Sequence, residues 1–233
     1  MKTKNFWSQK KSVNKFNYKK RSDFFLSEIH LFEKLNDKFE SVLDLGCASG
    51  NLIKLLNKYS KSLSYFGIDH VLEQIKIAKI KYPNQKFICA NFNDYKFLEK
   101  FDLVNATGFI QHSSNYSQVL KKMIFLSNKY ITFDVKIAKI NKDIIYLKDA
   151  FVKRKDIKIP YIIFSLNSFH SKLLKFPNIK NIYYYGYSTN INENARIPNY
   201  VKKVFSVGYL LEKNFDGNNT KSKIVGKIDD FEN

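Results

Sequence analysis

Ser41-Val-Leu-Asp-Leu-Gly-Cys-Ala-Ser-Gly-Asn51 is the stretch that decides the fold of this chain. An apolar run ends in one glycine, and a second glycine precedes helically spaced leucine and isoleucine residues between positions 52 and 56. This pattern predicts a buried parallel strand, a tight turn and a helix. Gly46 and Gly50 permit the turn and leave the main chain open to a ligand, while free N–H groups at the start of the helix favour a carboxylate. The stretch therefore predicts a nucleotide-type pocket.

A second strand that ends in an acid follows. Leu63-Ser-Tyr-Phe-Gly-Ile-Asp69 places a carboxylate 25 residues after Asp44. In dinucleotide-binding folds, an acid about 20 residues past the glycine turn holds ribose hydroxyls. Asp44, near the end of the first strand, can accept hydrogen bonds from a ligand ammonium or from the loop amides. The spacing predicts that two strand tips hold one ligand.

Three stretches of the chain resemble the class I S-adenosylmethionine-dependent methyltransferases. They are Val42–Gly50, Phe66–Asp69 and Phe101–Gly108, the last running into Gln111-His112. The resemblance covers about residues 41–135. It implies an α/β fold with a Rossmann-like, doubly wound, mostly parallel seven-stranded sheet and an antiparallel closing strand. It also implies S-adenosylmethionine as the methyl donor.

The resemblance assigns twelve residues to the donor. These are Asp44, Gly46, Cys47, Ala48, Gly50 and Asn51 around the methionine part, Asp69 and His70 at the ribose, Asn91 and Phe92 at the adenine, and Thr107 and Gly108 beside the sulfonium. Asn91 replaces the acid that usually meets the adenine amino group, and its amide oxygen can still accept from that group. Phe92 either stacks on the adenine or fills the core. Ala48 replaces the middle glycine of the turn.

Methyl transfer from a sulfonium is an in-line displacement that requires alignment and, for a hydroxyl acceptor, removal of a proton. No metal site is predicted. His112, just after the fourth strand, is the best candidate for the base because imidazole titrates in the right range. Its alternative role is packing and hydrogen bonding. Asp134, at the end of the fifth strand, is the second candidate, with capping or a loop contact as its alternative.

The chain divides into a basic arm at 1–22, a methyltransferase domain at 23–213 and a polar tail at 214–233 without regular structure. Within the domain, residues 136–180 form a basic cap or insertion. Periodicity predicts helices near 24–35, 71–80, 117–124 and 165–174, and strands near 86–90, 101–105, 130–135, 182–187 and 201–211. The last two strands are expected to be the closing antiparallel pair.

The net charge of +19 is concentrated in two segments. Residues 1–22 carry 8 basic groups and no acid, and residues 136–180 carry 11 basic groups against 3 acids, so each segment contributes +8. In the resembled fold both segments lie over the acceptor, where they would focus a positive field. We therefore expect an anionic small-molecule or glycan-precursor acceptor. Its expected contacts are Tyr18, Arg21, Lys153 and Arg154.

Several alternatives stay open at this level. Lysine-rich composition from A/T-rich codons could account for the charge, and the arm could be an unstructured tail. Oxygen is the expected methylated atom; RNA methylation is the alternative, and a non-catalytic protein that binds the donor ranks third. The chain has no apolar run of about 20 residues and no secretory segment, so a cytoplasmic protein with two buried, reduced cysteines is expected.

Overall fold

The computed structural model describes residues 6–10, 13–14, 24–35, 39–60, 62–214 and 221–231. Its centre is a nine-stranded sheet with the order β12-β9-β11-β5-β4-β1-β2-β3, and β8 pairs with β5 beside this path. The strands are β1 (Ser41–Leu45), β2 (Ser64–Asp69), β3 (Lys86–Cys89), β4 (Phe101–Ala106), β5 (Ser127–Ala138), β8 (Ile163–Ser165), β9 (Ile179–Thr189), β11 (Val204–Lys213) and β12 (Lys223–Ile228). The predicted Rossmann-like, mostly parallel sheet is confirmed.

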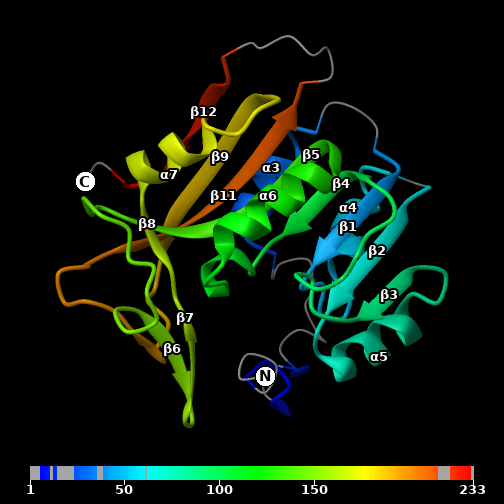
Figure 1. Cartoon of the computed structure of the whole chain (residues 1–233), viewed down its shortest axis with the longest axis horizontal. Helices are drawn as coiled ribbons and strands as arrows, with labels where there is room; N and C mark the ends of the chain where they lie inside the picture. Colours follow the sequence, from blue (N-terminus) through cyan, green and yellow to red (C-terminus); the bar gives the residue numbers. More distant parts are fainter. Residues whose placement is uncertain are drawn as a thin grey trace.

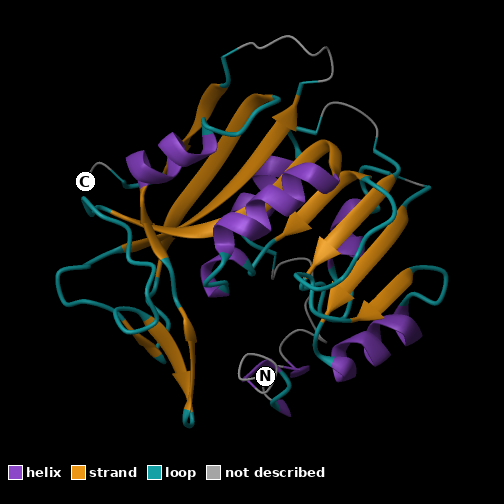
Figure 2. Cartoon of the chain, in the orientation of Figure 1, coloured by secondary structure: helices purple, strands orange, loops and turns teal. Residues whose placement is uncertain are grey.

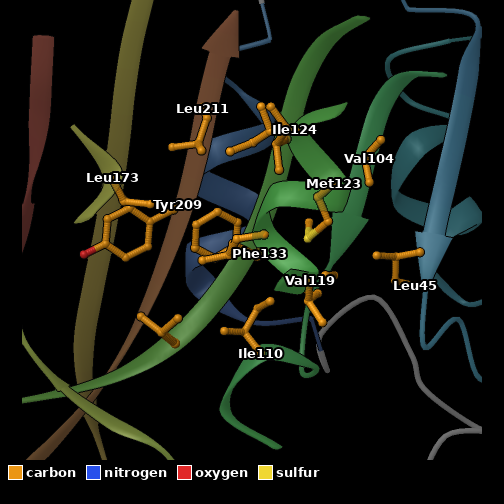
Figure 3. Close-up of a cluster of buried hydrophobic side chains, with 14 of the residues drawn as sticks. Leu45, Val104, Ile110, Val119, Met123, Ile124, Phe133, Leu173, Tyr209 and Leu211 are labelled. Carbon is orange, nitrogen blue, oxygen red and sulfur yellow. The ribbon is translucent and has the colours of Figure 1, made fainter. Parts of the chain in front are cut away.

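Helices cover both faces of the sheet, as Figures 1 and 2 show. They are α3 (Leu26–Phe32), α4 (Leu52–Leu56), α5 (Leu72–Lys81), the short 3-10 helix η2 (Ile110–His112), α6 (Tyr116–Leu126) and α7 (Leu166–Leu173). Side chains of α3, α4 and α5 pack on one face. The other face carries α6 and α7, and Figure 3 shows Val119, Met123 and Ile124 of α6 against Leu45, Val104 and Phe133 of the strands. The core is therefore layered on both sides of the sheet.

Alternation of side chains along the strands explains this layering. Leu43 and Leu45 of β1 belong to the cluster under α6, whereas Val42 belongs to the cluster under α3 and α4. Successive side chains of a strand point to opposite faces, so a strand covered on both faces reads as a continuous apolar run. Asp44 faces the same side as Val42, which places a carboxylate inside an otherwise apolar layer.

The antiparallel closing pair is confirmed, but the number of strands differs from the prediction. β11 pairs antiparallel with both β5 and β9. Beyond the expected seven strands, β8 lies beside β5, and β12 pairs in parallel with β9 along the outer edge. The expectation of a polar tail without regular structure is therefore wrong for Lys223–Ile228. Two of its residues, Ile224 and Ile228, are partly buried and pack against the core.

The predicted cap at 136–180 divides into two parts. A small three-stranded sheet, β10-β6-β7, contains β6 (Phe151–Arg154), β7 (Ile157–Pro160) and β10 (Ala195–Arg196). Helix α7, by contrast, belongs to the main core, because Phe169 is fully buried against Phe133 and Tyr209. Only the hairpin β6–β7 and its neighbours project as a cap, which Figure 1 shows below the main sheet.

Part of the N-terminal arm is docked on the domain. Phe6 is 1 % exposed and packs in the cap cluster with Val152, Ile159 and Tyr161. The backbone carbonyl of Val13 accepts a hydrogen bond of 3.2 Å from Nε2 of Gln74 on α5. These described arm residues lie near the edge where β1 and β2 end (Figure 1). Tyr18 and Arg21 lie outside the described residues.

Among the described residues, the helices are too short or too polar to cross a membrane.

Candidate functional site

The turn after β1 has the geometry that its glycines predict. Gly46 and Gly50 adopt φ values of +69° and +74°, the left-handed region that favours glycine. The Gly46 amide donates to the carbonyl of Ile68 on β2 at 2.8 Å. A Cβ atom at Gly46 would lie 2.9 Å from the Phe109 ring, so the turn has no room for a side chain there. At the end of β1, the main chain of the turn at Gly46 is thus not covered by a side chain of its own.

Ala48, in the middle of the turn, also has a positive φ, of +46°. This conformation costs an L-residue with a side chain about 1–2 kcal/mol. The amide of Ala48 donates to Oδ2 of Asp69 at 3.0 Å, and the amide of Val71 donates to Oδ1 at 2.9 Å. The acidic tip of β2 therefore holds the glycine turn directly. Burial raises the pKa of Asp69, and the hydrogen bonds from Val71 and Ala48 oppose that rise.

Asp44 has different partners from those expected. The Tyr65 hydroxyl donates to its Oδ2, and Nδ2 of Asn105 donates to its Oδ1 at 2.7 Å. The expected contact with a loop amide is made by Asp69 instead. Asp44 is 4 % exposed, and burial raises its pKa to about 7, against the opposing hydrogen bonds from Tyr65 and Asn105. A ligand ammonium beside this carboxylate would favour its charged form.

Residues that sequence reasoning missed extend these contacts across the sheet. The Asn105 amide oxygen accepts from the hydroxyls of Thr107 at 2.9 Å and Thr132 at 2.8 Å. Tyr65, Asp44, Asn105, Thr132 and Thr107 thus form one continuous set of hydrogen bonds, which we call the polar ladder. The signal in the sequence was a polar residue within the apolar part of each strand, and it becomes readable only when the order of the strands is known.

Other residues predicted around the methionine part are buried at the same turn. The Cys47 thiol is buried beside Gly67, where an added Cβ atom would lie 2.7 Å from its sulfur, and burial raises the pKa of this thiol. Nδ2 of Asn51, just before α4, donates to the Ser49 hydroxyl at 3.2 Å. Cys89 is exposed, so the prediction that both thiols are buried is wrong for Cys89.

The residues predicted at the adenine make local contacts. Nδ2 of Asn91 donates to Asp94 at 2.8 Å, and its Oδ1 accepts from the Asn93 amide at 3.1 Å. Phe92 is 3 % exposed and fills the core, with Nζ of Lys122 at 4.5 Å from its ring centroid. Core packing, one of the two roles predicted for Phe92, is therefore present, and stacking on the adenine stays a prediction. The main chain of Phe92 lies shortly after the end of β3.

At the ribose end, His70 follows Asp69, and its Nε2 atom is buried without a hydrogen-bond partner among the described residues. At the end of β4, Gly108 has a φ of +75°, and a Cβ atom there would meet no other atom within 4 Å. These features fit an adenosyl group with a small reacting end. The Nε2 atom of His70 is available at the ribose, and the turn at Gly108 leaves open space for the reacting end.

The two candidate catalytic residues lie at this same edge. The Asp134 carboxylate, 1 % exposed, accepts from the Gly108 amide, so it holds the loop after β4. The capping or loop role that was its alternative is therefore present. His112 belongs to η2, and its Nδ1–H donates to the Pro160 carbonyl at 2.8 Å, which leaves the lone pair on Nε2. Burial, with the nearby Lys136 charge, lowers the pKa of His112 to about 4, so the ring is neutral at pH 7.

The cap reaches this edge through β7. The amide of Ile162 donates to the Gln111 carbonyl at 2.8 Å, beside the contact between His112 and Pro160. The Trp7 ring lies 5.3 Å from the His112 ring, centroid to centroid. The arm, η2 and the cap thus meet where the acceptor was predicted.

The predicted acceptor contacts in the cap lie near its hairpin turn. The Arg154 guanidinium is 4.5 Å from the centroid of the Phe6 ring, so it packs on the arm. Lys153 is exposed and pairs across the hairpin with Lys158. Arg154 therefore contacts the arm, and Lys153 carries an exposed charge on the hairpin.

The fold is that of the class I S-adenosylmethionine-dependent methyltransferases. Residues 36–154 match the model of the methyltransferase domain family, and the chain belongs to this family.

Individual relatives match only parts of this chain. A putative methyltransferase 235L of Invertebrate iridescent virus 6 is 29 % identical over 126 residues, which are 49 % of this chain and 48 % of that protein. (S)-coclaurine N-methyltransferase of Papaver somniferum is 33 % identical over 89 residues, which are 36 % of this chain and 25 % of that protein. The chain therefore matches half of the first relative and a quarter of the second.

A solved structure extends the similarity of fold. An O-methyltransferase from a trans-AT PKS multienzyme of Brevibacillus brevis, in complex with S-adenosyl-L-homocysteine, has a TM-score of 0.58 and 14 % identity. The alignment covers 80 % of this chain and 71 % of that one.

Proposed function

We propose that this chain transfers a methyl group from S-adenosylmethionine to a small-molecule acceptor. The observation that carries the proposal is the hydrogen bond between the Ala48 amide and the Asp69 carboxylate, because it joins the bare glycine turn to the acidic strand tip. Membership of the methyltransferase domain family supports it. S-adenosylmethionine supplies an electrophilic methyl group on a sulfonium; the protein has to hold it and align the acceptor.

In this proposal the donor lies across the ends of β1, β2, β3 and β4. The turn from Asp44 to Asn51 holds the methionine part, Asp69 and His70 the ribose, the main chain at Asn91 and Phe92 the adenine, and Thr107 with Gly108 the reacting end. The two carboxylates at the strand tips complement a positively charged ligand. No metal is required for this chemistry.

For an acceptor that loses a proton, His112 and Asp134 are the proposed groups. The lone pair on Nε2 of His112 is available at pH 7 because the ring is neutral and Nδ1–H is held by Pro160. The low pKa makes this imidazole a weak base. Asp134 holds the loop at Gly108 through its hydrogen bond from the Gly108 amide.

We further propose that the acceptor carries an anionic group, as in a phosphorylated sugar or another glycan precursor, and is methylated on oxygen. The basic hairpin at Lys153 and Arg154 supports the anionic group, since Arg154 packs on Phe6, Phe6 packs on Trp7, and the Trp7 ring contacts the His112 ring. Nitrogen is the second candidate atom, and the similarity to a protein named (S)-coclaurine N-methyltransferase favours it.

Two experiments test these proposals. S-adenosylhomocysteine at about 100 times its dissociation constant should stabilise the protein by about 2.7 kcal/mol, which raises Tm by about 5–10 °C. Adenosine monophosphate at the same concentration is the control. An unchanged Tm with saturating S-adenosylhomocysteine would overturn the donor assignment. For the acceptor, paired phosphosugars that differ only in a hydroxyl or an amino group should show, by mass spectrometry, which atom gains the methyl group.

A further inference from the structure

The polar ladder crosses the sheet at the level of Asp44, near the ends of β1 and β4. Asp44 of β1 is in register with Asn105 of β4, and Asn105 is in register with Thr132 of β5. Tyr65 reaches Asp44 from the neighbouring strand β2. Four adjacent strands therefore each contribute one polar side chain to the same buried layer.

Because these side chains are buried, the loss of one of their hydrogen bonds would cost stability. The exposed fractions are 1 % for Tyr65, 4 % for Asp44, 2 % for Asn105 and 3 % for Thr132. A buried polar group that loses its partner costs free energy, whereas a fully satisfied network fixes one arrangement of its members. The ladder thus holds these strand ends in a single relative geometry.

Asn105 is the member of the ladder that donates a hydrogen bond on one side and accepts hydrogen bonds on the other. Its Nδ2 group donates to the Asp44 carboxylate at 2.7 Å, while its Oδ1 atom accepts from Thr107 at 2.9 Å and Thr132 at 2.8 Å. An amide is the side chain that presents a donor to a carboxylate and an acceptor to two hydroxyls at once, without a charge. A carboxylate at the same place would oppose Asp44, and an aliphatic side chain would leave the Asp44 oxygen and both hydroxyls without this partner.

We propose that Asn105 is a positioning residue for the methyl donor: through its two amide atoms it sets the Asp44 carboxylate and the Thr107–Gly108 loop relative to each other. The inference rests on the proposed donor site. It adds a residue outside the twelve assigned to the donor, one that joins the group assigned to the methionine part with the loop assigned to the sulfonium. The alignment of the reacting methyl group then depends on a side chain of β4.

The test is the near-isosteric variant Asn105→Asp, with S-adenosylhomocysteine as the probe in calorimetry at pH 6 and pH 8. Two carboxylates within hydrogen-bond distance do not both ionise readily, so one of them holds a proton at pH 6 and acts as the donor that the amide was. At pH 8 the pair repels and the geometry is lost. We expect the variant to bind at least about tenfold more weakly at pH 8 than at pH 6.

The wild type should respond in the opposite direction. The titratable groups that face Asp44 are Tyr65 of β2, Cys47 of the turn, Glu28 of α3 and Asp69. Ionisation of Asp44 favours a ligand ammonium, so wild-type affinity should be equal or higher at pH 8. A reversal of the sign of the pH dependence is an effect that a merely structural role of Asn105 would not produce.

Gln85→Ala is the control for general loss of stability. Gln85 accepts from the Tyr65 amide at 2.8 Å and donates to the Leu63 carbonyl at 3.0 Å, near the start of β2. It should lower Tm without changing the affinity for S-adenosylhomocysteine by more than about twofold.

Circular dichroism at each pH ensures that only folded protein is compared. If Asn105→Asp is unfolded at pH 8, Asn105→Ser carries the test; it cannot reach both sides and should bind at least about tenfold more weakly at both pH values. Folded Asn105 variants that bind within about twofold of the wild type at both pH values would overturn the proposal. Failure of the wild type itself to bind would instead overturn the donor site.

Discussion

The donor side and the acceptor side of this edge are built in different ways. The residues assigned to the donor lie between Asp44 and Gly108, on four neighbouring strand ends joined by the polar ladder and by the contact between Ala48 and Asp69. The acceptor side combines Phe6 and Trp7 with η2, Asp134 and the cap hairpin. The first is held by hydrogen bonds within the sheet, between neighbouring strands; the second depends on contacts that the arm, a short helix and the cap hairpin make outside the sheet. Binding of the donor and access of the acceptor should therefore respond separately to mutation.

The largest effect on stability is expected at Asp44. Its pKa in the folded protein, about 7, is above the usual 3.8. The folded state thus binds the proton more tightly than the unfolded state, and the stability this provides is present below about pH 4 and lost as the pH rises to about 7. Urea unfolding of the wild type should show stability falling by about 2–4 kcal/mol over this window relative to Asp44→Asn. Parallel pH profiles of the two proteins would contradict this reading.

Gly46→Ala should destabilise the protein by about 2–3 kcal/mol. The substitution carries the cost of a left-handed conformation, and its Cβ atom would also clash with the Phe109 ring, 2.9 Å away. Gly108→Ala is its matched partner, since Gly108 has a similar φ of +75° and open space around the added atom. Chemical denaturation should give the Gly108 variant only the conformational part, about 1 kcal/mol. Equal losses would mean that the clash is relieved by movement of Phe109.

Phe6→Ala tests most directly whether the donor side and the acceptor side respond separately to mutation. The ring is buried in the cap cluster and carries the Arg154 guanidinium, so its loss should release the arm locally. Trp7 is the single tryptophan of the chain, and its emission should shift to the red. Trypsin should cleave the arm about tenfold faster. The affinity for S-adenosylhomocysteine should stay within about twofold; a larger change would show that the arm also supports the donor side.

Ala48→Gly should have the smallest effect. Glycine removes the cost of the positive φ of +46° but adds freedom to the unfolded chain, so a net gain of about 0.5 kcal/mol is expected. Thermal unfolding measures it. A loss of stability would indicate that the alanine methyl group packs in the turn.

Sequence reasoning succeeded where local chemistry demands particular residues. Gly46 and Gly50 take the positive φ values that the turn requires, and Asp69 sits at the tip of β2, as its spacing from the turn predicts. It failed where partners come from elsewhere in the chain. Asn105 is an ordinary polar residue until β4 is placed beside β1, and β12 is a polar stretch until β9 offers it an edge.

The acceptor side shows the same limit. Phe6 looks like part of a solvated basic arm, because the pocket that buries it is formed by β6, β7 and β10 more than a hundred residues later. Similarly, the low pKa of His112 is set by its burial and not by any neighbouring residue in sequence. The expected anchors Lys153 and Arg154 stay a prediction, because neither charge nor the resembled fold specifies where a hairpin turn points.

The central claim is that the acidic tip of β2 and the glycine turn of β1 hold one adenosyl ligand together. Calorimetry of the wild type and of Asp69→Ala with S-adenosylhomocysteine tests this most directly. The account predicts saturable heat for the wild type and an affinity at least about a hundredfold lower for the variant, which loses both the ribose contact and the hydrogen bond to Ala48. Equal heats for the two proteins, or no heat for either, would contradict it.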